Sequence, residues 1–174
     1  VVREDFGFEL PNQGHHFNGN SLFYRFTPAG PDHSQVAACA GMADYIDNFS
    51  THHGGGVGAE AARLAHSLIR EHEVALLQPL LDYLSVKNSV RLIGPSDAAG
   101  RAPTVAVALQ QSAEDVARAL VPFGIMAGGG DFYAGRPLGA MGVDMKHGVL
   151  RVSFVHYTQK TEVDRLIAAL DRVL

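Results

Sequence analysis

The sequence predicts an α+β fold, with a small antiparallel or mixed sheet that is packed with helices and preceded by a long linking helix. Residues 149–155 alternate between apolar and polar side chains, which is typical of a strand with one buried face. Residues 161–173 repeat apolar side chains at helical spacing instead. From residue 59 onward the predicted order is helix, strand, strand, helix, strand, strand, helix.

Residues 1–32 are irregular and rich in glycine and proline. Within them, residues 22–26 predict one short strand. The segment is unusually apolar for a free N-terminus, so we interpret it as part of a large domain that the chain does not contain.

Residues 33–86 predict two linking helices. Apolar side chains recur three and four apart over residues 34–49, and Asp32 or Ser34 is a suitable capping residue. A second helix is expected over residues 59–86, which Pro79 should kink or divide. Cys39 lies among alanines in the first helix, where we expect a small buried apolar side chain.

Residues 87–174 predict the C-terminal small domain. The helix that follows Ser112 opens with a capping pattern, and Gly124 lies just past its end, as a C-cap glycine does. The strands are expected at residues 90–94, 104–109, 125–127 and 149–155, and the helices at 112–121 and 161–173.

Composition excludes several classes of function. No apolar run approaches the roughly 20 residues that span a bilayer, so no membrane contact is expected. The net charge of −4 argues against a nucleic-acid surface. One cysteine, Cys39, forms no internal disulfide and no cysteine-based metal cage, which makes a cytoplasmic protein the simplest interpretation.

The nine histidines predict no metal site. Neighbouring histidines, as at positions 52 and 53, point in different directions in a helix or strand, and H-E-x-x-H is missing. The three glycines at 128–130 are not followed by the Gly-Lys-Ser/Thr of a phosphate-binding loop. They indicate either a flexible turn or a loop that approaches a ligand closely.

Arg151 is the most informative single residue. It lies on the polar face of an otherwise apolar strand, where a guanidinium needs a partner. Its planar, permanently charged fork suits bidentate binding of a carboxylate. A structural salt bridge is the alternative.

Several segments, taken in order, resemble the C-terminal part of the class V aminotransferases, which are pyridoxal-phosphate (PLP) enzymes of fold type I and include cysteine desulfurases. The most specific segment is 150–157 with the helix that follows it. The supporting segments are 40–46, 90–95, 101–107 and 124–134. The resemblance implies the small domain of that fold, preceded by a long linking helix.

The resemblance implies roles for individual residues. Arg151 would bind the α-carboxylate of an amino-acid substrate, and Asp131, Phe132 and Tyr133 would line the substrate end of the site. Sulfur-mobilising cysteine desulfurases carry a catalytic cysteine in this loop. Tyr133 stands at or beside its position, which disfavours persulfide chemistry.

The resemblance also implies a homodimer in which the turn at Gly30 reaches the cofactor phosphate of the neighbouring subunit. Pro31 replaces the family's threonine, so the contacts would come from Gly30, His33 and Ser34. The family's Schiff-base lysine lies upstream of this turn, whereas the first lysine here is Lys87. We therefore expect no catalytic residue in this chain, and PLP only in a complete enzyme.

Two functions remain open at this point. The chain is either the C-terminal segment of a PLP-dependent transferase or lyase, or a non-catalytic stand-alone small domain that binds a carboxylate metabolite or a protein partner. Which amino acid is the substrate also stays open, as does the choice between transamination, desulfuration and another elimination.

Overall fold

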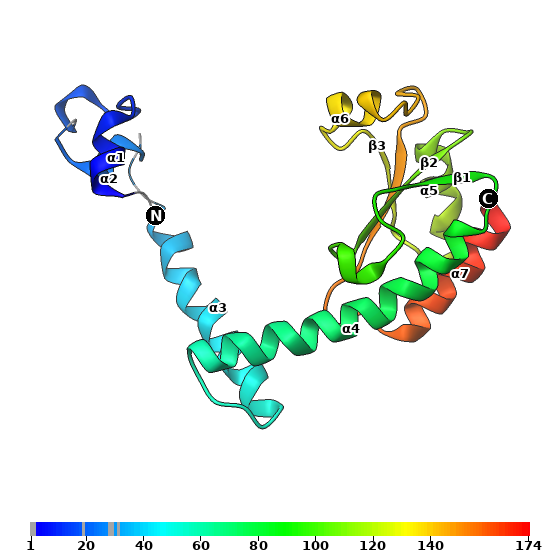
Figure 1. Cartoon of the computed structure of the whole chain (residues 1–174), viewed down its shortest axis with the longest axis horizontal. Helices are drawn as coiled ribbons and strands as arrows, with labels where there is room; N and C mark the ends of the chain where they lie inside the picture. The colour runs from blue at the N-terminus through cyan, green and yellow to red at the C-terminus, as the bar shows by residue number, and fades with distance from the viewer. Residues whose placement is uncertain (1–2, 19, 28–29, 31) are drawn as a thin grey trace. The chain divides into compact units, whose positions relative to one another are not determined.

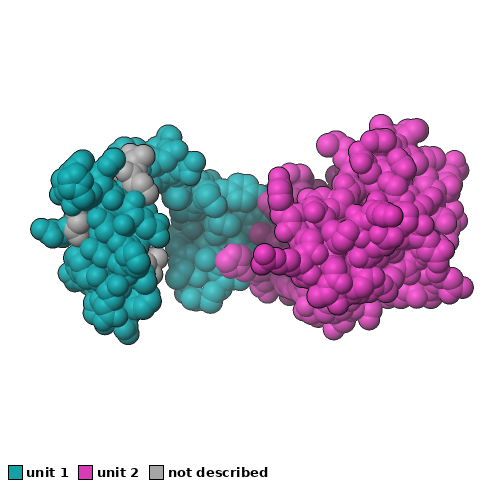
Figure 2. Space-filling view, turned by 90° about the horizontal axis from the view of Figure 1, so that it is seen from above, with its two compact units in different colours: residues 1–65 teal, residues 66–174 magenta. Residues whose placement is uncertain are grey.

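The computed structural model describes residues 3–18, 20–27, 30 and 32–174 (Figure 1). They form two compact units, residues 1–65 and residues 66–174, which Figure 2 colours teal and magenta. Within the part that is described, no helix is long and apolar enough to cross a membrane.

The first unit begins with three short helical segments: α1 (Glu4–Glu9), η1 (His16–Asn18) and α2 (Leu22–Arg25). The guanidinium of Arg25 donates hydrogen bonds to the carbonyl oxygens of Phe8 and Leu10, which ties α2 to the end of α1. The strand predicted at residues 22–26 is therefore wrong. A short apolar run does not distinguish a strand from one turn of helix.

Helix α3 (His33–His52) starts at Asp32, whose carboxylate accepts hydrogen bonds from the N–H groups of Ser34 and Gln35, each at 3.1 Å. The predicted cap at Asp32 is thus present. The predicted burial of Cys39 is wrong, because its side chain is exposed. The apolar stripe of this helix is exposed as well, with Met42 at 70%.

A tight corner joins α3 to α4 (Ala59–Ser85). Ser50, Ala61 and Ala65 are fully buried there. Gly55 is required at this corner, because a Cβ atom at its position would lie 2.4 Å from the Ser50 hydroxyl oxygen. Helix α4 is continuous through Pro79, so the predicted division at this proline is wrong.

The second unit contains a four-stranded antiparallel sheet, which confirms the α+β prediction. Its spatial order is β1-β2-β4-β3. The edge strand predicted at 125–127 is displaced toward the glycines that follow. The strands are β1 (Val90–Ile93), β2 (Thr104–Leu109), β3 (Gly128–Gly130) and β4 (Val149–Ser153).

One face of this sheet packs on helices and forms the main core of the unit. It meets the second half of α4, α5 (Ala113–Leu120) and α7 (Lys160–Val173). Burying a Val, Leu or Phe side chain of this kind stabilises a fold by ~1.5–3 kcal/mol. The sheet contributes Val105, Val107, Leu109, Leu150 and Val152, and Phe154 follows directly after β4.

The other face, which we call the outer face, is only partly covered. A smaller apolar cluster of Leu138, Val143 and Val149 lies on it, and Leu138 comes from the short helix α6 (Gly135–Ala140). In Figure 1, α6 (yellow) lies apart from α4 and α7. Two further single turns, η2 (Ala98–Gly100) and η3 (Val121–Phe123), connect elements of this unit.

Candidate functional site

Arg151 lies on the outer face in the middle of β4. It is paired with Ala106 of β2 on one side and with Gly128 of β3 on the other. Both neighbours are small, so the guanidinium has room around it. Among the residues that the structure describes, Arg151 makes no salt bridge, and its side chain is exposed.

The guanidinium of Arg151 stacks on the ring of Phe132. Its Cζ atom is 3.9 Å from the ring centroid. The same ring packs against the backbone of Gly128, where a Cβ atom would lie 2.9 Å from Phe132 Cζ and 3.0 Å from Cε1. Phe132 also packs on the apolar cluster around Leu138, so the ring has contacts with the outer face as well as with Arg151.

The turn that carries Phe132 has an unusual backbone. Phe132 and Tyr133 are consecutive non-glycine residues in the left-handed region, with φ of 50° and 61°. Asp131 holds the turn, because its carboxylate accepts a hydrogen bond from the Tyr133 N–H at 3.1 Å and its carbonyl accepts one from the Ala134 N–H at 2.8 Å. Backbone in this region persists only where its surroundings stabilise it.

The four residues predicted to bind substrate thus differ in their surroundings. It brings Arg151 and Phe132 into direct contact. Asp131 uses its carboxylate to hold the turn, and the Tyr133 side chain is fully exposed in this chain.

Two hydroxyl groups lie beside Arg151 on the same face. Thr104 pairs with Ser153 in the next row of the sheet, and the Thr104 hydroxyl donates to the Ser153 hydroxyl oxygen at 3.1 Å. This pair was not predicted from the sequence. The alternation in β4 places Ser153 on the face of Arg151, but the register of β2 against β4 is not readable from the sequence.

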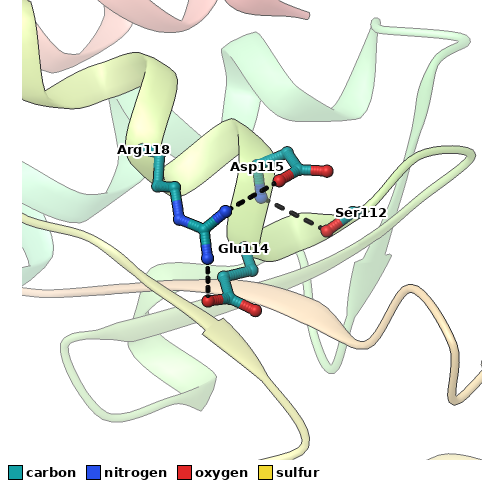
Figure 3. A network of polar contacts seen from close by, with 4 residues as sticks. All are labelled: Ser112, Glu114, Asp115 and Arg118. Atoms are coloured by element: carbon teal, nitrogen blue, oxygen red, sulfur yellow. Dashed lines mark hydrogen bonds and ion pairs between the residues drawn. The ribbon is translucent and has the colours of Figure 1, made fainter.

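The start of α5 fixes the position of β3. A Cβ atom on Gly129 would lie 2.3 Å from the backbone nitrogen of Glu114, so the strand and the helix touch directly. The Ser112 hydroxyl oxygen accepts a hydrogen bond from the Asp115 N–H at 3.3 Å. Arg118 forms ion pairs with both Glu114 and Asp115 (Figure 3). A well-capped α5 thus supports the strand that adjoins Arg151.

The residues predicted to contact a cofactor phosphate lie in the first unit, around the start of α3. Gly30 is left-handed, with φ of 85°, and its N–H donates to the Thr27 carbonyl at 2.9 Å. The Ser34 hydroxyl donates to Asp32. That hydrogen bond, followed by one from the Gln35 N–H, lowers the pKa of Asp32. Pro31 of the predicted turn lies outside the described residues.

Two of the lysines are held in ion pairs. Lys87 pairs with Asp171 and lies over the Tyr83 ring, 4.9 Å from its centroid. The hydrogen bond with Asp171 raises the pKa of Lys87, which is the opposite of what a nucleophilic amine requires. Lys160 pairs with Asp164 at 2.7 Å.

By their chemistry, the described residues offer a place for a carboxylate rather than for a phosphate. Arg151 offers an open guanidinium fork. At the start of α3, by contrast, the Asp32 carboxylate already occupies the N–H groups of Ser34 and Gln35 that a phosphate would use. No group of three or more metal-ligating side chains occurs in the described ranges.

The chain is similar to known proteins over most of its length. The family model described as aminotransferase class-V matches residues 56–166. The aminotransferase-like protein FGM3 of Gibberella zeae is 30% identical over 173 residues, which cover 95% of this chain and 40% of that protein. The chain thus spans 40% of the length of this relative.

Solved structures share the fold. An apo cysteine desulfurase from Thermococcus onnurineus has a TM-score of 0.56 and 23% identity, over 64% of this chain and 27% of that one. The cysteine desulfurase CsdA from Escherichia coli has a TM-score of 0.51 and 22% identity, over 68% of this chain and 31% of that one.

Proposed function

Because the chain belongs to the aminotransferase class-V family, we propose that it supplies the carboxylate-binding end of an active site in a PLP-dependent enzyme that acts on an amino acid. The observation that carries the proposal is the open guanidinium of Arg151, stacked on Phe132. A planar fork with a fixed plane binds a carboxylate through two parallel hydrogen bonds.

Arg151 would orient the substrate as well as bind it. Two hydrogen bonds to one carboxylate fix the direction of the bond from that carboxylate to Cα, which reduces the freedom of the reacting carbon. The hydroxyls of Thr104 and Ser153 lie in the next row and would supply further polar contacts on this face. PLP, when bound in the complete enzyme, supplies an electron sink for a carbanion.

Other parts of the site would come from outside these 174 residues or from the neighbouring subunit. The Schiff-base lysine would be one of them, because the family's lysine lies upstream of the turn at Gly30, whereas the first lysine of this chain is Lys87. In a homodimer, Gly30, His33 and Ser34 would face the cofactor phosphate of the neighbouring subunit. That contact requires the Asp32 carboxylate to move away from the start of α3.

Transamination or an elimination without a protein persulfide is favoured over sulfur mobilisation. Tyr133 stands at or beside the position expected for a catalytic cysteine, and the one cysteine, Cys39, lies in the first unit on α3. A persulfide carrier needs a thiol at the substrate end of the site, which this loop does not provide.

Replacing Arg151 in the complete enzyme tests the proposal. The twenty L-amino acids serve as substrates, and the amine without an α-carboxylate serves as the comparison for the best of them. We expect Arg151→Ala to lower kcat/KM for the amino acid by roughly 30- to 700-fold, as the loss of ~2–4 kcal/mol of charged hydrogen bonding implies. Turnover of the amine should stay unchanged.

Arg91→Ala is the matched control. Arg91 pairs with Ala108, is exposed and lies on the same outer face of the sheet. It should leave kcat/KM unchanged. If Arg151→Ala also leaves kcat/KM unchanged, the proposed role of Arg151 in binding the substrate carboxylate is wrong.

A further inference from the structure

The contact between Arg151 and Phe132 also depends on the absence of a side chain at Gly128. Gly128 lies directly opposite Arg151 in the sheet, and the Phe132 ring fills the space that a Cβ atom would take. The φ of Gly128 lies outside the left-handed region, so its backbone does not require glycine. The close approach of the ring is what excludes a larger residue.

We propose that Phe132 and Gly128 act together as the positioning device for Arg151, which sets the plane of the guanidinium for the substrate carboxylate. This inference rests on the proposed function of Arg151. Phe132 and Gly128 are positioning residues in it, because both act on the substrate through Arg151.

The geometry supports positioning rather than simple packing. An exposed arginine has many side-chain conformations, and holding one of them costs entropy. The Phe132 ring supplies a flat surface 3.9 Å from the guanidinium carbon, where a cation–π interaction favours one orientation. Stacking occupies the faces of the guanidinium and leaves its N–H edges available for a carboxylate.

The ring itself is held on two sides. It packs on the apolar cluster around Leu138, and the left-handed turn at Phe132 and Tyr133 is tied by the Asp131 carboxylate. Gly128 leaves the space that the ring occupies, since an added Cβ atom would lie 2.9 Å from the far end of the ring. Such a contact displaces the ring and not the strand, because β3 is anchored on α5 through Gly129.

Phe132→Leu is the first test, because leucine keeps apolar volume but removes the aromatic face. In the complete enzyme we expect KM for the best of the twenty L-amino acids to rise about 3- to 30-fold, the range of a partly desolvated cation–π contact. The KM of the corresponding amine without a carboxylate should not change, and kcat should change less than KM.

Phe123→Leu is the matched control. Phe123 also lies under an arginine, with Arg172 Cζ 5.6 Å from its ring centroid, in the same unit but on the helical side. The control should leave KM unchanged. A rise in KM with Phe123→Leu equal to that with Phe132→Leu would show a general loss of packing and would overturn the proposal.

Gly128→Ala tests the pair. We expect it to raise KM on its own and to add little in the Phe132→Leu background, because the smaller side chain leaves room for the new methyl group. Fully additive effects would mean that the two residues act separately, which contradicts the proposal.

An NMR measurement gives a readout that is independent of activity. The guanidinium of Arg151 lies over the Phe132 ring, with Cζ 3.9 Å from the centroid, so we expect the ring current to shift the Nε–Hε proton resonance upfield. Phe132→Leu and Gly128→Ala should remove this shift, and Phe123→Leu should preserve it. A shift that survives Phe132→Leu would overturn the stack.

The two proposals fail in distinguishable ways. If Arg151→Ala leaves kcat/KM unchanged, the carboxylate-binding role is wrong, and the positioning role, which depends on it, is wrong as well. If Arg151→Ala lowers kcat/KM but Phe132→Leu does not raise KM, only the positioning role fails.

Discussion

The Asp32 carboxylate occupies the N–H groups of Ser34 and Gln35 and thereby limits what the start of α3 can bind. Hydrogen bonds from the Ser34 hydroxyl and the Gln35 N–H hold its pKa below the ordinary value of 3.8. A lowered pKa in the folded state means that the cap stabilises α3 above pH 3.8 and loses that effect as the pH falls through the lower, folded value. At neutral pH the Asp32 carboxylate is therefore ionised, and the cap contributes its full stabilisation of α3.

We expect the amide resonances of Ser34 and Gln35 to titrate together, with a midpoint below 3.8. An NMR pH titration measures this directly. Asp32→Asn is the control, since asparagine caps a helix as well as aspartate but does not ionise. A midpoint at or above 3.8 in the unaltered chain would contradict the hydrogen bonding seen at this cap.

Residue-level prediction from the sequence succeeded where a local pattern was enough. The alternation over residues 149–155 puts Arg151 opposite the buried side chains of β4, and Arg151 is indeed exposed while Leu150 and Val152 are buried. The stack on Phe132 could not be predicted in the same way. It depends on two left-handed residues in a loop and on a strand register, and neither leaves a periodic signal.

At the scale of elements, the cap of α5 supports the strand next to the site. We expect Ser112→Ala to destabilise the second unit by ~1 kcal/mol, because an N–H of the first turn loses its acceptor. The ion pairs of Arg118 are exposed and add only ~0.3–0.5 kcal/mol each, so they do not compensate. Urea denaturation measures the difference.

Ser67→Ala is the comparison for this measurement. Ser67 is exposed within α4, where alanine is the better helix former, so stability should stay equal or rise slightly. Equal stabilities for Ser112→Ala and Ser67→Ala would show that the cap contributes nothing.

Elements with strong periodicity were predicted within a few residues, as for α4 and α7. The errors fall on short segments. Residues 22–26 form a helical turn because four or five apolar residues carry no period. The edge strand lies at residues 128–130, where glycine has a poor intrinsic preference for strands, because pairing with β4 determines it.

At the scale of the whole chain, the two units differ sharply in how much they bury. Nearly the whole apolar core belongs to residues 66–174. In the first unit, large apolar side chains remain exposed, among them Phe17 at 71% and Val36 at 63%. The assignment of residues 1–32 to a large domain stays a prediction.

We therefore expect residues 66–174 to fold alone, with one cooperative calorimetric transition and a dispersed amide NMR spectrum. Residues 1–65, expressed alone as the comparison, should show neither, because their buried apolar area is too small to offset the entropy of ordering the chain. A collapsed NMR spectrum for residues 66–174 would contradict the independence of this unit.

The left-handed turn at Phe132 and Tyr133 has a consequence for how such a protein can be improved in the laboratory. At Tyr133, whose side chain is exposed, glycine would adopt the same backbone with less strain, so a screen for heat resistance alone should enrich glycine there. At Phe132 the relief of strain is opposed by the loss of its packing on the cluster around Leu138. A relaxed turn at position 133 would hold the neighbouring Phe132 ring, and with it the guanidinium of Arg151, less firmly, so selection has to include turnover from the first round.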